Sequence, residues 1–114
     1  MIWILYMKIK IFSDMICGWC FIGQIKLNRA LKSFPETKFE IEHIPFQLNP
    51  DMPIEGIDRN EYLKIKFGGK EFAQPMYDRM TEEANKEGLN FNLNNIKKTP
   101  NTVFSHLLIK LAEQ

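Results

Sequence analysis

The sequence has almost no net charge and no long apolar run. Its 15 Lys and Arg against 14 Asp and Glu leave a net charge of +1 over 114 residues, so no long-range field draws the chain to nucleic acid or to an anionic membrane. The opening stretch MIWILYMKIK is apolar only as far as Met7, whereas a membrane span needs about 20 apolar residues. No basic residues precede this stretch and no small-residue cleavage site follows it, so we expect no signal peptide. These absences predict a cytoplasmic protein with no nucleic-acid partner and no membrane partner.

Cysteine is also scarce, and both cysteines stand together. Cys17 and Cys20 lie in SDMICGWCFIG, residues 13–23. Two cysteines are too few for a disulfide scaffold, and the cytosol keeps thiols reduced. A structural zinc site needs four ligands, and the sequence offers no second CxxC and no paired histidines, only His43 and His106. The pair is therefore interpreted as a redox dithiol, with two inert buried thiols or half of a zinc site as the alternatives.

The first half of the sequence has the pattern of a β-α-β unit. Residues 8–12, KIKIF, and residues 38–44, KFEIEHI, alternate polar and apolar side chains as strands do. Between them, apolar residues from Gly18 to Pro35 recur at mostly helical spacing. A crossover helix of this kind predicts two parallel strands joined right-handedly. Met7 is an alternative start, because MKIKIFSD reads as a complete first strand.

The second half is predicted to be helical after an irregular connection over residues 46–56. Asp58 with Glu61 fits a capping box for a short helix that ends near Phe67 before two glycines. A longer helix follows, with Pro75 expected in its first turn and Gly88 as its stop. Its apolar stripe, expected to be core, is Met76, Tyr77, Met80 and Ala84.

A last helix is expected to start at Thr99. Threonine is a good N-cap and Pro100 suits the first helical position. Its apolar stripe, again expected to be core, consists of Val103, Phe104, Leu107, Leu108 and Leu111. These patterns predict an α/β chain with two parts, an N-terminal βαβ unit over residues 1–56 and a helical part over residues 57–114.

The predicted reactivity of the two cysteines depends on their position at the start of a helix. A helix N-terminus stabilises a thiolate, so Cys17 is expected to be the nucleophile. Cys20 lies about one turn further on the same side and is expected to resolve a mixed disulfide. Trp19 is either a packing residue or part of a peptide-binding surface. Spacing alone favours a solvated His106, because it lies off the apolar stripe of the last helix, and Asp14 reads as a turn residue.

Four segments together resemble the DsbA-like thioredoxin-fold proteins, in particular their cytoplasmic FrnE-like branch. They are KIKIFSDMICGWCFIG, PFQLNPDMPIEG, DRNEYLKIKFGG and EGLNFNLNNIKKTPNTVFSH. The resemblance implies that residues 1–56 are the N-terminal βαβ half of a thioredoxin-like domain and that residues 57–114 are a helical insertion after its second strand. It also implies thiol–disulfide exchange by Cys17 and Cys20 on a disulfide-containing protein or small thiol. It implies no cofactor, although glutathione is a candidate co-substrate. It also implies that Asn101, Thr102 and His106 face the active site, beside Gly18 and Trp19.

The sequence departs from the family pattern at two places. Gly18 stands where the family usually has proline, and residues 1–114 do not include the ββα portion that completes the thioredoxin fold. The chain is therefore expected to be a truncated or partial one, with a first strand whose open edge invites self-association. Two alternatives to the oxidoreductase remain. One is a glutathione-dependent 2-hydroxychromene-2-carboxylate isomerase-like enzyme, in which serine usually replaces the first cysteine; the other is a non-catalytic remnant or interaction module.

Overall fold

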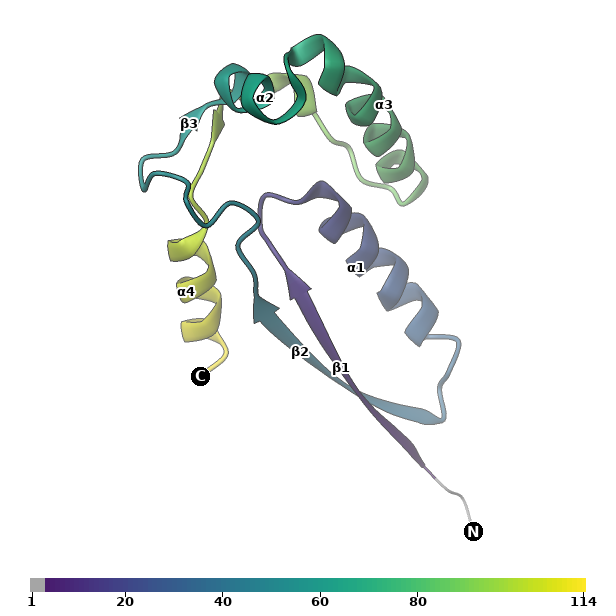
Figure 1. The fold of residues 1–114 in the computed structure, drawn as a ribbon. Helices are drawn as coiled ribbons and strands as arrows, with labels where there is room; N and C mark the ends of the chain where they lie inside the picture. The colour runs from purple at the N-terminus through teal and green to yellow at the C-terminus, as the bar shows by residue number, and fades with distance from the viewer. Residues whose placement is uncertain (1–3) are drawn as a thin grey trace.

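The computed structural model describes residues 4–114 and consists of a strand pair, four α-helices and a short clasp (Figure 1). The elements in chain order are β1 (Leu5–Ser13), α1 (Gly18–Leu31), β2 (Thr37–Pro45), β3 (Ile57–Asp58), α2 (Arg59–Phe67), α3 (Lys70–Lys86), the 3₁₀ turn η1 (Leu93–Asn95), β4 (Lys98–Thr99) and α4 (Val103–Ala112). The proposed extension ahead of Met7 lies partly outside the described residues, but Leu5 and Tyr6 belong to β1.

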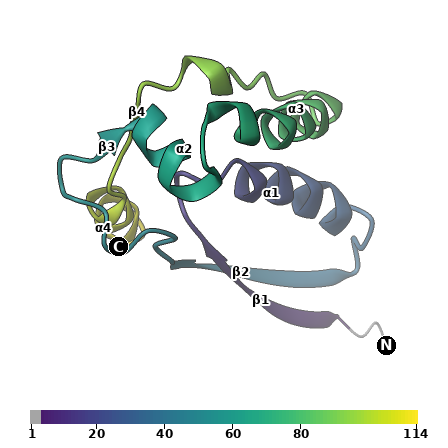
Figure 2. The ribbon, with the colours of Figure 1, turned by 45° about the horizontal axis from the view of Figure 1, so that its top comes forward.

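The predicted β-α-β unit is confirmed. β1 and β2 pair in parallel, with Ile9 opposite Ile41 in the register, and α1 crosses between them (Figure 2). α1 ends at Leu31, earlier than the predicted stop at Pro35, because a turn follows in which Ser33 and Phe34 donate backbone hydrogen bonds to the preceding residues. Phe34 is consequently outside the helix and exposed.

The helices α2 and α3 start and stop close to where the sequence predicted. The Asp58 side chain accepts a hydrogen bond from the Glu61 amide at 3.1 Å and so caps α2, and the helix ends at Gly68, whose φ of +89° places it in the left-handed region. α3 begins at Lys70, so Pro75 lies in its second turn and not in its first as predicted. The missing N–H of this proline removes one internal helix bond.

A two-residue clasp closes this helical segment. β3 pairs antiparallel with β4, which places Ile57 opposite Thr99 and Asp58 opposite Lys98. The prediction that Thr99 and Pro100 start the last helix is therefore wrong. Thr99 is fully buried in β4, Thr102 is the N-cap residue of α4, and the helix begins at Val103.

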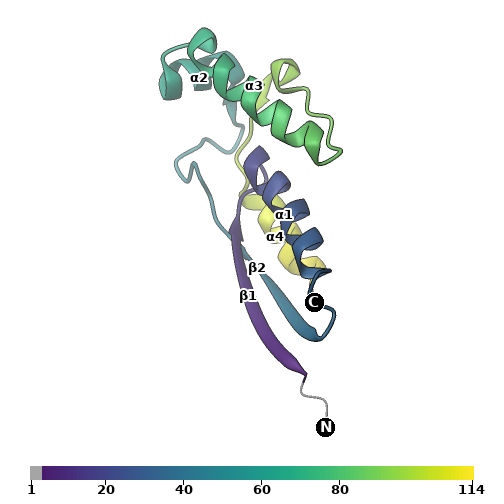
Figure 3. The same ribbon diagram turned by 90° about the vertical axis from the view of Figure 1, so that its right-hand side faces the viewer.

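The core lies mainly around α3, as its apolar stripe predicted. One buried cluster joins Ile22 of α1 to Met80 and Ala84 of α3. A second cluster joins Leu63 of α2 to Ala73 and Tyr77 of α3. Figure 3 shows α2 and α3 grouped at one end of the molecule, beyond the start of α1. The βαβ unit therefore meets the helical segment along α1, from Ile22 through Lys26, which pairs with Glu83, to Arg29, which pairs with Glu87.

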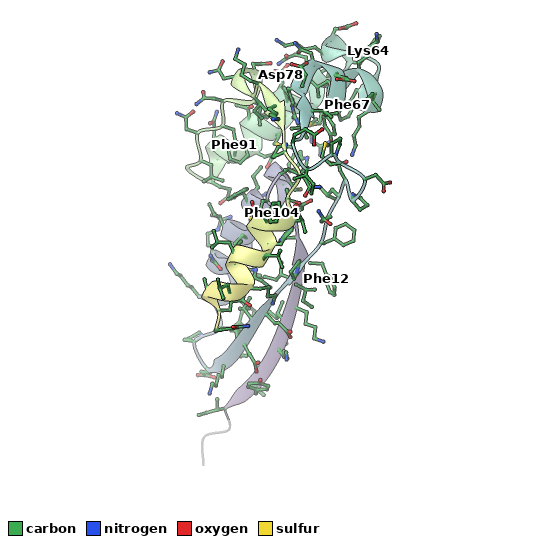
Figure 4. All side chains as sticks on the ribbon, turned by 90° about the vertical axis from the view of Figure 1, so that its left-hand side faces the viewer. Phe12, Lys64, Phe67, Asp78, Phe91 and Phe104 are labelled. Atoms are coloured by element: carbon green, nitrogen blue, oxygen red, sulfur yellow. The ribbon has the colours of Figure 1, made fainter. Side chains whose placement is uncertain are left out.

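The apolar stripe of α4 is not core, contrary to the prediction. Phe104, Leu107, Leu108 and Leu111 are all more than half exposed, whereas His106 on the same helix is buried. Figure 4 shows Phe104 on α4 and Phe12 on the strand pair, two of the exposed aromatic side chains. The reason is that α4 contacts the rest of the chain through its polar side: Lys110 Nζ donates to the His43 carbonyl at 2.8 Å.

The molecule is elongated. Its principal extents are 60 × 32 × 19 Å and its radius of gyration is 17.2 Å, compared with about 13 Å for a compact domain of this length. Much apolar surface on β1 and α4 consequently stays in contact with solvent. Within the part of the chain that the structure describes, no helix combines the length and apolar character needed to cross a membrane.

Candidate active site

The two cysteines lie at the junction between β1 and α1. Cys17 is the N-cap residue of α1, with extended φ and ψ of −93° and 106°. Its amide donates to the Asp14 carbonyl at 3.2 Å, and its own carbonyl accepts from the Cys20 amide at 3.1 Å. Both thiols are free and half-buried. The strand end and the first helical turn therefore hold both cysteines on one short, hydrogen-bonded segment.

The environment of Cys17 is less favourable to a thiolate than its position suggests. Burial raises the pKa of the Cys17 thiol, and the neighbouring Cys20 side chain raises it further. The backbone N–H groups of Cys20 and Trp19 act in the opposite direction, as expected at a helix start, but they do not outweigh the first two effects. A larger fraction of Cys17 therefore stays protonated at neutral pH than in an exposed cysteine.

Asp14 is a buried carboxylate and not merely a turn residue. Its side chain is 1 % exposed, and its oxygens accept from the amides of Met15 at 2.8 Å and Leu48 at 2.7 Å. The Thr102 hydroxyl and His106 also hydrogen-bond to it. Burial alone would raise the pKa of Asp14, but these four hydrogen bonds together lower it below its ordinary value of 3.8.

His106 completes this buried network. Its side chain is 8 % exposed, and Nε2 lies 3.0 Å from Asp14 Oδ1. Because an ionised carboxylate can only accept, Nε2 carries the proton and donates. The interpretation of His106 as a solvated residue is therefore wrong. Helical spacing pointed to the apolar stripe of α4 as the buried side, whereas hydrogen bonding to Asp14 determines which side of the helix is buried.

Asn101 holds the chain just before α4. Its Nδ2 donates to the Met52 carbonyl at 2.7 Å, and its Oδ1 accepts from the Val103 amide at 2.9 Å. Gln47 donates to the same oxygen at 3.4 Å. The sequence-predicted residues thus separate. Cys17, Gly18 and Trp19 line a groove, whereas Cys20 lies outside it, in a second depression that Asp14 also lines. Thr102 and His106 surround Asp14, and Asn101 fixes the segment that carries them.

The groove beside the dithiol is about 490 Å³ in volume and mostly apolar. One wall is the segment from Met15 to Trp19, and the other comes from α2, α3 and the residues around β4. The residues from the second wall include Arg59, Tyr62, Lys66, Phe67, Met76, Tyr77, Met80, Leu93, Ile96, Lys98, Thr99 and Pro100. An extended segment carrying a disulfide can therefore lie against Cys17 and contact both parts of the molecule at once.

Gly18 is needed for the two walls to meet. A Cβ placed on Gly18 would overlap the Met80 sulfur and would lie 3.1 Å from Phe91 Cε2. Met80 is itself buried in the cluster that joins α1 to α3. The glycine at this position thus allows α3 to pack directly against the start of α1. This contact gives a physical reason for the departure from the usual proline.

Sequence reasoning missed Asp14 and Arg59 as site residues. The one signal for Asp14 was its position between a strand and the CxxC, which also suits an ordinary turn. Arg59 appeared only as the residue after a helix cap, and nothing local shows that it reaches the groove. For metal binding, residues 4–114 contain no cluster of three or more His, Cys, Asp or Glu side chains placed to hold an ion.

Comparisons with known proteins agree with this architecture. The model of the "DSBA-like thioredoxin domain" family matches residues 8–114. The uncharacterized protein YwbO of Bacillus subtilis (strain 168) is 30% identical over 77 residues, which are 68% of this chain and 36% of that protein. The crystal structure described as "probable DsbA oxidoreductase SCO1869" from Streptomyces coelicolor superimposes with a TM-score of 0.81 at 29% identity, over 93% of this chain and 46% of that chain.

These matches confirm the predicted fold class, an α/β chain of thioredoxin-like architecture. The chain spans less than half the length of both relatives, 36% of the first and 46% of the second.

Substitution of Gly18 by alanine tests the contact between α1 and α3. The added methyl group overlaps Met80, so Gly18→Ala is expected to lower the free energy of unfolding by about 1–3 kcal/mol. The double variant with Met80→Ala should lose less stability than the sum of the two single variants, as measured by a double-mutant cycle in urea. Gly23→Ala is the control, because nothing lies within 4 Å of its added Cβ. Strict additivity would contradict the contact.

Substitution of Asp14 by asparagine tests the buried carboxylate. Asp14→Asn is expected to lower the free energy of unfolding by about 1–3 kcal/mol at neutral pH. Because the folded-state pKa of Asp14 is depressed, the carboxylate stabilises the fold above about pH 3.8 and this contribution is lost as pH falls through the folded pKa. The difference between wild type and variant should therefore shrink in urea titrations at acidic pH. The exposed Asp51→Asn is the control, and a pH-independent difference would contradict the assignment.

Proposed function

Because the chain belongs to the family of DSBA-like thioredoxin domains, we propose that it performs thiol–disulfide exchange through Cys17 and Cys20. The observation that carries the proposal is the position of Cys17, the N-cap residue of α1, on a groove of about 490 Å³. The description of SCO1869 as a probable DsbA oxidoreductase supports the same chemistry. The alternative of a glutathione-dependent 2-hydroxychromene-2-carboxylate isomerase has no comparable support. A second thiol within one helical turn of Cys17 is needed for thiol–disulfide exchange, whereas isomerisation of such a carboxylate does not use it.

The exchange proceeds in two steps. The Cys17 thiolate attacks one sulfur of a substrate disulfide, which forms a mixed disulfide and releases the other substrate sulfur as a thiolate that takes up a proton. The Cys20 thiol then loses its proton and attacks the sulfur of Cys17. This step releases the second substrate thiol and leaves a disulfide between the two cysteines. The protein dithiol is oxidised by two electrons, and the substrate disulfide is reduced by two.

The environment of Cys17 favours the reducing direction. A strong oxidant of this kind owes its potential to a stabilised thiolate in the reduced form. Here burial and the neighbouring Cys20 raise the pKa of the Cys17 thiol, so the reduced form gains no such stabilisation. We therefore assign the chain a role as a reductant or isomerase of disulfides in proteins or small thiols, with glutathione as a candidate thiol partner.

Two cysteine variants test this function. Cys17→Ser is expected to abolish reduction of a model disulfide, because the attacking sulfur is lost. Cys20→Ser should accumulate a mixed disulfide with substrate, because the resolving sulfur is lost, and intact-protein mass spectrometry under non-reducing conditions detects the adduct. For wild type, the rate of alkylation of Cys17 should keep rising above pH 9.0, its ordinary pKa. Normal turnover of Cys17→Ser would refute the proposal.

We also propose that two copies of the chain associate through β1. Among the described residues, β1 pairs only with β2, so its other edge offers unpaired backbone groups. Leu5, Tyr6, Met7 and Phe12 on the same strand are all more than half exposed. Pairing of two such edges would satisfy backbone groups and cover this apolar surface.

A charge placed on β1 should weaken this association. Phe12→Lys is expected to shift the dimerisation constant toward monomer by about tenfold or more, because like charges then meet across the new strand pair. Sedimentation velocity over a concentration series measures the shift. Phe34→Lys is the matched control, since Phe34 is 59% exposed, close to the 62% of Phe12, but lies outside the strand. A wild-type chain that stays monomeric at high concentration would exclude the association.

A further inference from the structure

Arg59 is a half-buried cation with only neutral partners. Its Nε donates to the Tyr77 hydroxyl at 2.8 Å, and one terminal nitrogen donates to Thr99 Oγ1 at 3.1 Å. Both partners are buried, with Tyr77 3% and Thr99 0% exposed. Within residues 4–114, Arg59 forms no salt bridge with any Asp or Glu, although half-buried charges are normally paired. Its guanidinium retains N–H donors for a further acceptor.

A second cation lies against the same aromatic ring as Arg59. The guanidinium of Arg59 lies 5.1 Å from the centre of the Tyr62 ring, and the ammonium of Lys66 lies 5.7 Å from that centre. The ring face attracts each positive charge but supplies no counter-ion. Both cations can therefore still bind an anion in the groove.

The groove as a whole has charge of one sign. Arg59, Lys66 and Lys98 are its charged lining residues, and the described residues that line it include no Asp or Glu. Asp58, next to Arg59 in sequence, is exposed and accepts from the Glu61 amide. The nearest carboxylate along the chain therefore serves as a helix cap. It lies opposite Lys98 in the β3–β4 pair, but within residues 4–114 it forms no salt bridge with Arg59, Lys66 or Lys98.

The cations share the groove with Cys17, the proposed nucleophile. Cys17 and Trp19 line the same cavity as Arg59, so a ligand whose disulfide reaches Cys17 also lies along Arg59. The remaining surface is apolar and includes Met15, Met76, Met80 and Leu93. Charge complementarity and this apolar lining together define the ligand: an extended segment with apolar side chains and a carboxylate close to its cysteine.

We propose that the groove selects disulfide substrates in which an acidic side chain lies next to the reacting cysteine, and that Arg59, supported by Lys66 and Lys98, binds this carboxylate. The inference rests on the proposed exchange function and specifies its substrate class. Arg59 is a specificity residue in this account. It positions the substrate sulfur at Cys17 and takes no part in bond making.

The test uses two peptides that differ in one charge. Acetyl-Leu-Cys-Asp-Leu-amide and acetyl-Leu-Cys-Asn-Leu-amide each carry a mixed disulfide between their cysteine and 2-thiopyridine. The Cys17 thiolate attacks the peptide sulfur and releases 2-thiopyridone, which absorbance follows, and Cys20 then displaces the peptide thiol. Wild type is expected to react about fivefold faster with the Asp peptide, the range of a partly exposed ion pair, and salt should reduce this preference.

Three variants locate the preference. Arg59→Gln should bring the Asp-to-Asn rate ratio close to one, whatever its effect on the rate with the Asn peptide, and Arg59→Lys should restore part of the ratio. A merely structural role of Arg59 would slow both peptides equally. Lys32→Gln on the exposed end of α1 is the charge-matched control and should leave the ratio unchanged. If Arg59→Gln unfolds, Lys98→Gln replaces it and should lower the ratio.

The outcomes separate this inference from the proposed function. Equal wild-type rates with both peptides, or a ratio that Arg59→Gln does not change, would overturn the acidic specificity while leaving the exchange chemistry in place. Reaction of Cys17→Ser at the wild-type rate would instead refute the exchange function on which the inference rests.

Discussion

The Asp14 carboxylate accepts hydrogen bonds from the Met15 and Leu48 amides, the Thr102 hydroxyl and His106. A buried charge is tolerated only when such donors surround it, so each segment that supplies one is held in place. The backbone carbonyl of Asp14 also accepts from the Cys17 amide. The loop after β1, the connection after β2, the start of α4 and the first cysteine are therefore linked through one residue.

The groove depends on a second set of polar contacts. Arg59 joins Tyr77 of α3 to Thr99 of β4, and the pairing of β3 with β4 closes the helical segment at its two ends. Gly18 then lets Met80 pack against the first turn of α1. Polar contacts thus fix the outline of the groove, and apolar contacts set the distance between its walls. The exposed apolar residues of β1 and α4 contribute little to either.

Local sequence patterns predicted most helices and strands well, but predicted the burial and tertiary contacts of their side chains poorly. Alternation found both strands, and the capping residue Asp58 placed α2 within one residue of its start. The prediction that the apolar stripe of α4 is buried was wrong, because hydrophobic spacing gives no information on a hydrogen bond between Asp14 and His106. The prediction of Thr99 as an N-cap was wrong for a similar reason. Threonine is a good N-cap residue, but Thr99 pairs with Ile57 in the short β3–β4 sheet, a contact that local sequence does not indicate. The thiols were found from their spacing, whereas Arg59 required the tertiary fold to bring it to the groove.

The contact between Asp14 and His106 also bears on the order in which the molecule forms. The two residues are separated by 92 positions, whereas paired residues of β1 and β2 such as Leu5 and Thr37 are 32 positions apart, so closing the longer loop costs about 1 kcal/mol more entropy. During synthesis the CxxC and its helix exist well before His106 is made. The thiols accordingly spend that interval without the buried network beside them, and the environment of the dithiol is completed only after His106 has been made.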